Sequence, residues 1–317
     1  MSTLLEKIFM DMDKIATPTA RSIFLSNDVD LREKEPVFFS SLRLKNGVTK
    51  TTSRDRMTDV DTWLIDLLPK GGFQKVLDVG ISSGVTTVEL CELLESNGVA
   101  YQMTGMDSDL TSYLVIFAND RSILLDKSGN PIHFEMAGKG FGYVRGTNLK
   151  HILDRVLLSI QAWLFIKLRL KRTLDSIEST AVIKGVEIHK IDLVCREIKE
   201  NPAIRLIEDS IFSEASDERY SLIRAANILN KIYFSDEQLS AAIQKLSERL
   251  EPGGLFLVCR TNMEGENNAT LFRLAGPGRF EITARFGIGS EIEYLVLGID
   301  GLSTKRLDAL EFDPAAS

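Results

Sequence analysis

Small residues interrupt an apolar stretch near residue 80 and could bring the main chain close to a ligand. Val76, Leu77 and Val79 precede the interruption, residues 80–84 form it, and apolar residues then resume with helical spacing. Glycine has no Cβ, and the first amides of a helix point outward, so a strand, turn and helix in this order can bind a polar group through backbone N–H groups. The pattern predicts a cofactor site. The alternative is a turn that is rich in glycine and serine for conformational reasons alone.

The spacing of the glycines separates two classes of cofactor. A dinucleotide motif G-x-G-x-x-G laid from Gly80 requires glycine at the positions of Ser82 and Val85, which disfavours a nicotinamide cofactor. Asp78, Gly80, Ser82 and Gly84 instead resemble the first motif of the class I (Rossmann-like) S-adenosylmethionine-dependent methyltransferases. The chain departs from that motif where Ser82 replaces the central glycine.

The resemblance continues downstream and covers residues 73–117 and 204–299. Asp107 lies about 20 residues beyond the turn, the distance that one helix and a returning strand require. Asp209 then follows a third strand pattern, and residues 224–229 end a fourth. These segments appear in the order of the methyltransferase fold.

The predicted fold is α/β, with a doubly wound, mostly parallel seven-stranded sheet and a terminal antiparallel hairpin. Strands are expected at 75–79 and 101–106, helices at 84–96 and 109–117, and the hairpin at 280–286 and 292–298. Ser235 is expected to cap a helix from Asp236 to Leu250. Residues 1–70 are expected to form an N-terminal helical extension or lid. Residues 71–317 are expected to form the methyltransferase domain, interrupted after its second strand by an insertion at about 118–203 that contains a hairpin over 122–135.

The resemblance implies S-adenosyl-L-methionine as cofactor and assigns its contacts. Gly80, Ser82 and Gly84 would lie against the methionine part of the cofactor, and Asp78 would reach its ammonium group through water. Asp107 would accept the ribose hydroxyls, and Asp209 would face the adenine amine, with a backbone amide supplied by Ser210 or Ile211. Asn227 would lie beside the transferred methyl group. The alternatives are a helix N-cap for Asp209 and a polar residue that ends a strand for Asn227.

Methyl transfer needs mainly the alignment of the acceptor with the methyl group and the exclusion of water. An oxygen acceptor also needs a base, for which the candidates are His133, His151 and His189, all in the insertion, with Asn227 beside the methyl. Each of these histidines, taken singly, is more often a surface or packing residue than a base. No catalytic residue is therefore assigned from the sequence.

Composition restricts the partners. The net charge of -7 disfavours nucleic acid as a partner. Cys91, Cys195 and Cys259 are too widely spaced for a metal site or a disulfide framework, so no metal is expected. The reduced cysteines and the lack of a long apolar run favour a cytoplasmic protein. Residues 152–172 are expected to form an apolar helix with basic ends. This helix could lie at a membrane surface as a peripheral contact, pack in the core of the insertion, or contact a second copy of the chain in a homodimer.

The expected function is O- or N-methylation of a small-molecule, glycan or lipid-type acceptor. Residues 227–234 resemble a segment of the chemotaxis receptor methyltransferases, which leaves a protein carboxylate methyltransferase as one alternative. A binding or membrane-peripheral protein that keeps the fold without catalysis is the other.

Overall fold

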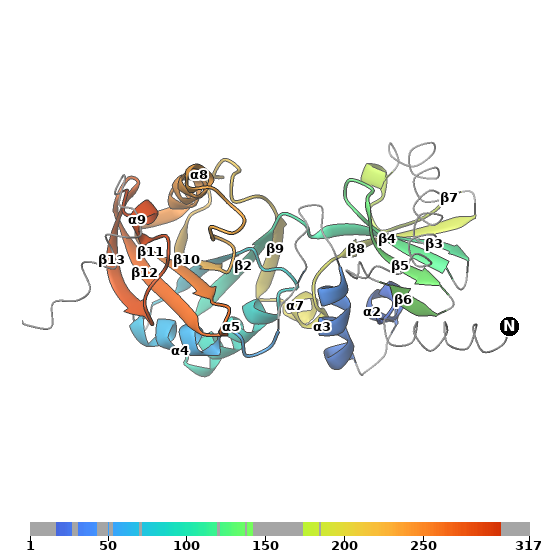
Figure 1. Ribbon diagram of the computed structural model, residues 1–317, viewed down its shortest axis with the longest axis horizontal. Coiled ribbons are helices and arrows are strands. Elements are labelled where there is room, and N and C mark those ends of the chain that lie inside the picture. The colour runs from blue at the N-terminus through green and yellow to red at the C-terminus, as the bar shows by residue number, and fades with distance from the viewer. Residues whose placement is uncertain are drawn as a thin grey trace, which may run out of the picture. The chain divides into compact units, whose positions relative to one another are not determined.

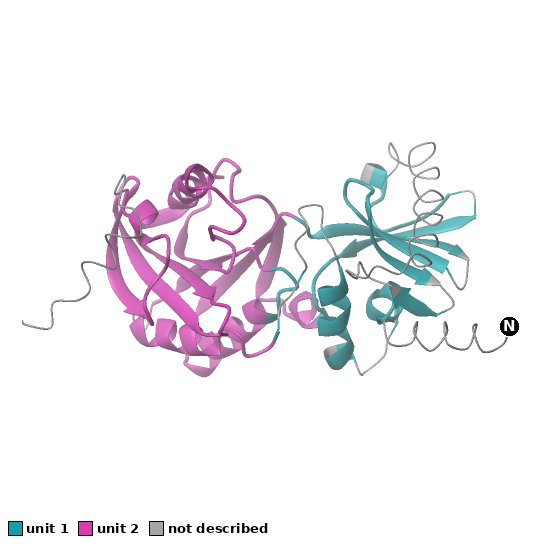
Figure 2. Cartoon of the chain, in the orientation of Figure 1, with its two compact units in different colours: residues 1–53, 82–85, 109–196 teal, residues 54–81, 86–108, 197–317 magenta. Residues whose placement is uncertain are grey.

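The computed structural model divides into two compact units (Figure 2). Unit 1 comprises residues 1–53, 82–85 and 109–196, and unit 2 comprises residues 54–81, 86–108 and 197–317. The structure describes residues 17–26, 31–42, 50, 53–69, 72–118, 121–136, 138–141, 174–183 and 185–298. The predicted domain boundaries remain predictions.

A seven-stranded mixed sheet forms the centre of unit 2. Its strands are β1 (Gln74–Val79), β2 (Tyr101–Asp107), β9 (Ile204–Glu208), β10 (Tyr220–Ala226), β11 (Leu250–Thr261), β12 (Asn267–Gly276) and β13 (Arg279–Phe286). The strand order is β13-β12-β11-β10-β1-β2-β9 (Figure 1). The five neighbouring strands β11, β10, β1, β2 and β9 pair in parallel. Strand β12 pairs antiparallel with β11, and β13 pairs antiparallel with β12.

Helices cover both faces of this sheet. The helices of unit 2 are α4 (Thr58–Leu67), α5 (Val85–Ser96, of which the first residue belongs to unit 1), α7 (Arg196–Glu200, likewise), α8 (Asp236–Ser247) and α9 (Glu293–Val296). Figure 1 shows α8 on one face and α4 and α5 on the other. Leu77 and Ile223 belong to the same buried apolar cluster as Leu239 of α8. Because side chains alternate along a strand, the neighbouring Asp78 and Arg224 point to the opposite face.

Unit 1 contains a separate antiparallel sheet of six strands in the order β6-β5-β4-β3-β8-β7. The strands are β3 (Thr111–Ala118), β4 (Arg121–Asp126), β5 (Pro131–Met136), β6 (Lys139–Phe141), β7 (Thr180–Ile183) and β8 (Val186–Asp192), and the helices are α2 (Ala20–Phe24), α3 (Leu31–Ser41) and the 3-10 helix η2 (Leu174–Ser176). A buried cluster that includes Tyr113, Ile123 and Ile188 forms its core.

The structure confirms several local predictions and corrects two. Strands β4 and β5 form the predicted hairpin over 122–135, and Ser235 caps α8 through a capping box. The predicted helix over 109–117 is wrong: this segment is β3, whose β-branched and aromatic residues pack in a sheet core. The predicted strand over 292–298 is also wrong, because α9 occupies it and β13 pairs instead with β12.

Two sequence predictions fall outside the residues that the structure describes, namely the helix over 152–172 and the candidate base His151. Over the described part of the chain, no helix combines the length and hydropathy needed to cross a membrane.

Candidate functional site

Four adjacent parallel strands of unit 2 end at one edge of the sheet, and a predicted site residue follows or ends each of them. Asp209 follows β9, Asp107 ends β2, Gly80 follows β1 and Asn227 follows β10. Between β1 and β10 the strand order reverses direction, and this switch point is where open α/β sheets bind ligands. The predicted residues of unit 2 are therefore brought to the edge where chemistry is expected.

Main-chain hydrogen bonds hold this edge together. The N–H of Gly80 donates to the carbonyl of Met106 at 2.8 Å, and the N–H of Asp209 donates to the carbonyl of Asp107 at 3.1 Å. On the other side of the switch point, the N–H of Asn227 donates to the carbonyl of Cys259 at 2.9 Å. The ends of neighbouring strands are thus fixed relative to one another by the backbone.

The turn after β1 has three residues in the left-handed backbone region. The φ angles are 72° at Gly80, 59° at Ser82 and 84° at Gly84. A Cβ at Gly80 would lie 2.9 Å from two side-chain carbons of Ile228, so packing within unit 2 already requires glycine there. Ser82 adopts the same backbone region without being a glycine, which is unfavourable for an L-residue.

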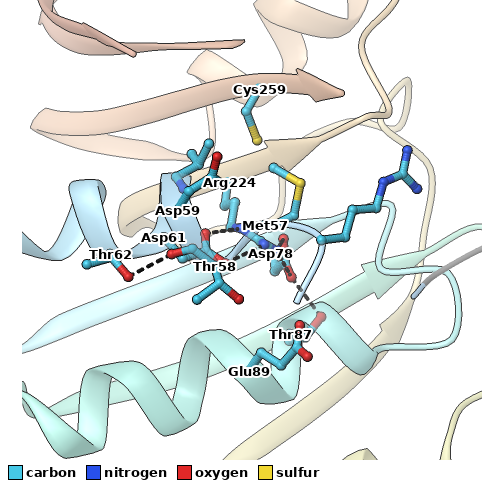
Figure 3. Close-up of polar contacts among 12 residues, drawn as sticks. Met57, Thr58, Asp59, Asp61, Thr62, Asp78, Thr87, Glu89, Arg224 and Cys259 are labelled. Carbon is cyan, nitrogen blue, oxygen red and sulfur yellow. Dashed lines mark hydrogen bonds and ion pairs between the residues drawn. The ribbon is translucent and has the colours of Figure 1, made fainter. Parts of the chain in front are cut away.

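Asp78 is buried and both of its carboxylate oxygens are engaged by side chains of unit 2. Arg224 on β10 donates from Nη1 to Oδ1 at 3.1 Å and to Oδ2 at 3.0 Å, and Thr87 on α5 donates to Oδ2 at 2.7 Å (Figure 3). The predicted water-mediated contact of Asp78 with the methionine ammonium remains a prediction. The contacts observed within unit 2 give this carboxylate a structural role at the end of β1.

Arg224 also pairs with Asp61 on α4, so two buried carboxylates flank one guanidinium (Figure 3). The Arg224–Asp61 hydrogen bonds measure 3.0 Å from Nε and 2.8 Å from Nη2. Burial raises the pKa of Asp61 to about 7, although the positive charge of Arg224 opposes this. Burial by itself would lower the pKa of Arg224, but the charges of Asp61 and Asp78 outweigh it and raise that pKa.

No role for Asp61 or Arg224 was predicted from the sequence. The available signal was an arginine within the apolar strand pattern of Leu222–Ala226, because a charged residue in a buried strand requires an opposite charge nearby. The partner could not be identified, since Asp61 is 163 positions away in the chain.

The two carboxylates at the other end of the edge differ in their surroundings. Asp107 is half-buried at the end of β2. Asp209 accepts a hydrogen bond from Arg249 at 2.9 Å and another from the N–H of Ser210 at 2.8 Å. Burial by itself would raise the pKa of Asp209, but hydrogen bonds from Ser213 and Arg249 outweigh it and lower the pKa. Asp209 is therefore ionised and oriented by Arg249, a partner that the sequence did not reveal.

Asn227 is held by side chains and main chain of β11 and of the segment before α4. Its Oδ1 accepts from the N–H of Thr261 at 2.8 Å, and its Nδ2 donates to Thr261 Oγ1 at 3.3 Å and approaches Met57 Sδ at 3.7 Å. The φ of Asn227 is 61°, a conformation that asparagine tolerates better than most residues. The amide is thus fixed in orientation at the end of β10.

The two described histidines lie on the antiparallel sheet of unit 1. His133 on β5 is buried, its Nε2 is 3.0 Å from Thr17 Oγ1, and burial lowers its pKa to about 3. His189 on β8 contacts Glu187 at 2.8 Å and Thr180 at 3.2 Å. A catalytic role for either remains a prediction. Within the described ranges, no group of three or more His, Cys, Asp and Glu side chains could hold a metal ion.

Comparisons with known proteins give no close relative. No family model matches the chain, and no curated protein does. Among solved structures, the N-methyltransferase NodS from Bradyrhizobium japonicum WM9, in complex with S-adenosyl-l-homocysteine, is 15% identical over 64% of this chain and 61% of that chain, with a TM-score of 0.30.

Two further solved structures have similarly low sequence identity and TM-score to this chain. The glycopeptide N-methyltransferase MtfA is 14% identical over 65% of this chain and 53% of that chain, with a TM-score of 0.30. A SAM-bound amino pentose methyltransferase from Micromonospora echinaspora is 12% identical over 70% of this chain and 64% of that chain, with a TM-score of 0.29. The chain thus spans less than two thirds of each. Such TM-scores are too low to transfer fold or function, so the assignment depends on the site geometry.

Proposed function

We propose that this chain is an S-adenosylmethionine-dependent methyltransferase. The observation that carries the proposal is the edge of the seven-stranded sheet, where Gly80, Asp107, Asp209 and Asn227 stand at the ends of four adjacent parallel strands. Their chemistry fits an adenosyl amino acid. Carboxylates accept hydrogen bonds from ribose hydroxyls and an adenine amine, and the backbone amides of a tight turn can bind a carboxylate.

The residues have distinct roles in this proposal. Asp107 accepts the two ribose hydroxyls, while Asp209, oriented by Arg249, faces the adenine amine next to the Ser210 amide. When bound, S-adenosylmethionine supplies a methyl group already activated by the sulfonium. Asn227, fixed by Thr261, lies beside the acceptor and orients it toward the methyl group.

The proposed acceptor is a small molecule, a glycan or a lipid-type compound, methylated on oxygen or nitrogen. Support comes from the acidic balance of the chain, whose net charge of -7 is unfavourable for binding a polyanion such as nucleic acid.

Calorimetric titration of the full chain with S-adenosylmethionine, S-adenosylhomocysteine and NAD tests the proposal. We expect both sulfur ligands to bind and NAD not to bind. Asp107→Asn should weaken S-adenosylmethionine binding about 10-fold to 100-fold, because it replaces a charged acceptor of two hydroxyl hydrogen bonds.

Asp66→Asn is the matched control, since Asp66 is an exposed carboxylate on α4 of the same unit. The affinity of the Asp66→Asn variant for S-adenosylmethionine should equal that of the wild type. Absence of binding of either sulfur ligand, a preference for NAD, or wild-type affinity in Asp107→Asn would contradict the proposal.

A further inference from the structure

A buried lysine in unit 1 contacts the turn that follows β1. Lys50 is only 2% exposed. Its Nζ donates to the main-chain carbonyl of Ser82 at 3.0 Å and to that of Leu193 at 3.4 Å. All three residues belong to unit 1, although Ser82 is 32 and Leu193 is 143 positions from Lys50 in the chain. The ammonium therefore links the turn to the segment that follows β8.

A second link joins the same two segments. The N–H of Cys195 donates to the carbonyl of Ser83 at 2.8 Å. The segment after β8 is itself held by the N–H of Leu193, which donates to the carbonyl of Leu110, just before β3, at 2.7 Å. Two consecutive carbonyls of the turn, those of Ser82 and Ser83, thus have fixed donors within unit 1. Such donors determine which way the peptide groups of the turn face.

The residue held by Lys50 has an unfavourable backbone conformation. Ser82 has a φ of 59°, in the left-handed region where an L-residue is strained and glycine is not. At this position the methyltransferase motif that the chain resembles has its central glycine. A strained conformation persists only where the surroundings impose it, and a charge-assisted hydrogen bond to the Ser82 carbonyl is a contact that can do so.

We propose that Lys50 is a positioning residue that holds the turn at Ser82 in its observed conformation and so compensates for the absence of glycine at that position. That this conformation serves to bind S-adenosylmethionine rests on the proposed function. Lys50 acts through the backbone of the turn, by fixing the direction of the Ser82 carbonyl and hence the conformation of the amides that follow it.

A rescue experiment distinguishes this role from a general contribution to stability. Lys50→Met removes the ammonium and keeps most of the side-chain volume. We expect the amides of residues 83–85 to exchange with deuterium about tenfold faster and S-adenosylmethionine to bind about tenfold more weakly. Ser82→Gly added to Lys50→Met should restore both to within about threefold of the wild type, because glycine adopts the left-handed conformation without strain.

Lys190→Met is the matched control, since Lys190 is an exposed lysine on β8 of the same unit, and it should leave both measurements unchanged. If Lys50→Met does not fold, Lys50→Gln replaces it, because the amide retains a donor with a shorter reach. For Lys50→Gln we expect a smaller increase in amide exchange and a smaller loss of S-adenosylmethionine affinity than for Lys50→Met, both again reversed by Ser82→Gly.

The outcomes separate the two proposals. Wild-type exchange and affinity in Lys50→Met, or a defect that Ser82→Gly does not reverse, would overturn the role of Lys50. Faster exchange reversed by Ser82→Gly, in a wild-type chain that does not bind S-adenosylmethionine, would support the role of Lys50 in shaping the turn and overturn the proposed function instead.

Discussion

The two units each bury a cation, and they do so with different oxygen partners. In unit 2, Arg224 is 0% exposed and hydrogen-bonds to the carboxylates of Asp61 and Asp78. In unit 1, Lys50 is 2% exposed and hydrogen-bonds to the main-chain carbonyls of Ser82 and Leu193. The guanidinium uses a planar fork of donors that matches carboxylates, whereas the ammonium is a compact charge that can attract several carbonyls.

The difference in partner oxygens has physical consequences. Carboxylates change charge with pH, and two of them around one guanidinium leave a net negative charge in the core when both are ionised. Main-chain carbonyls do not titrate, so the oxygen partners of Lys50 keep the same charge at every pH. Because these oxygens belong to the backbone, the hydrogen bonds from Lys50 act on backbone conformation. The arginine cluster therefore governs the stability of the sheet in unit 2 and its response to pH, and the lysine governs the shape of one turn.

The largest expected effect follows from removing the arginine. Arg224→Met leaves Asp61 and Asp78 buried without a counter-charge, and we expect the free energy of unfolding to fall by about 3–5 kcal/mol. Urea denaturation followed by circular dichroism measures this change. Adding Asp61→Asn and Asp78→Asn to Arg224→Met should recover part of the loss, because the uncompensated charges are then removed.

Arg279→Met is the control for this prediction, because Arg279 is an exposed arginine on β13 of the same sheet. Its unfolding free energy should stay within about 0.5 kcal/mol of the wild type. Equal losses in Arg224→Met and Arg279→Met would show that the buried cluster does not stabilise unit 2 as its geometry indicates.

The sequence predicted the edge of the seven-stranded sheet better than it predicted these clusters. The carboxyl ends of neighbouring parallel strands meet at one edge, so the order of strand patterns was enough to bring Gly80, Asp107, Asp209 and Asn227 of unit 2 together. These predictions came from local motifs, from chain order and from the resemblance to the methyltransferase family. The strand at 280–286 was also found, from its alternating pattern.

Features that depend on packing were not predictable in the same way. Residues 111–118 and 292–298 are short apolar runs, and such runs do not distinguish a strand from a helix until their neighbours are known. The partners of Arg224 are 163 and 146 positions away, and the carbonyl that Lys50 contacts after β8 is 143 positions away. No local pattern encodes which distant oxygen a buried cation will meet.

The next effect in size concerns pH. Burial raises the pKa of Asp61 to about 7, with Arg224 opposing the shift and Asp78 and Glu89 adding to it. Because the pKa is higher in the folded than in the unfolded chain, this group stabilises the fold fully below about pH 4. That stabilisation is lost as the pH rises through about 7, and we expect a loss on the order of 2–4 kcal/mol.

Asp61→Asn tests the pH prediction, because asparagine is neutral throughout this range. Subtracting the unfolding free energies of the variant from those of the wild type at pH 5, 6, 7 and 8 isolates the contribution of Asp61. The difference should become less favourable to the wild type as the pH rises. A difference that is constant with pH would mean that Asp61 titrates at the same pH in the folded and unfolded chains.

The smallest expected effect tests whether the cluster extends to α5. Thr87 is buried and donates from Oγ1 to Asp78 Oδ2 at 2.7 Å, so Thr87→Val removes one hydrogen bond to a carboxylate while keeping the shape of the side chain. We expect a loss of about 1.5–3 kcal/mol in the free energy of unfolding. The control is Thr62→Val on α4, where an exposed hydroxyl donates to the carbonyl of Thr58. Because Asp78 would retain Arg224 after this substitution, its carboxylate should stay paired, which is why the loss should be smaller than that of Arg224→Met. Equal stability of Thr87→Val and Thr62→Val would restrict the buried cluster to Arg224 and its two carboxylates.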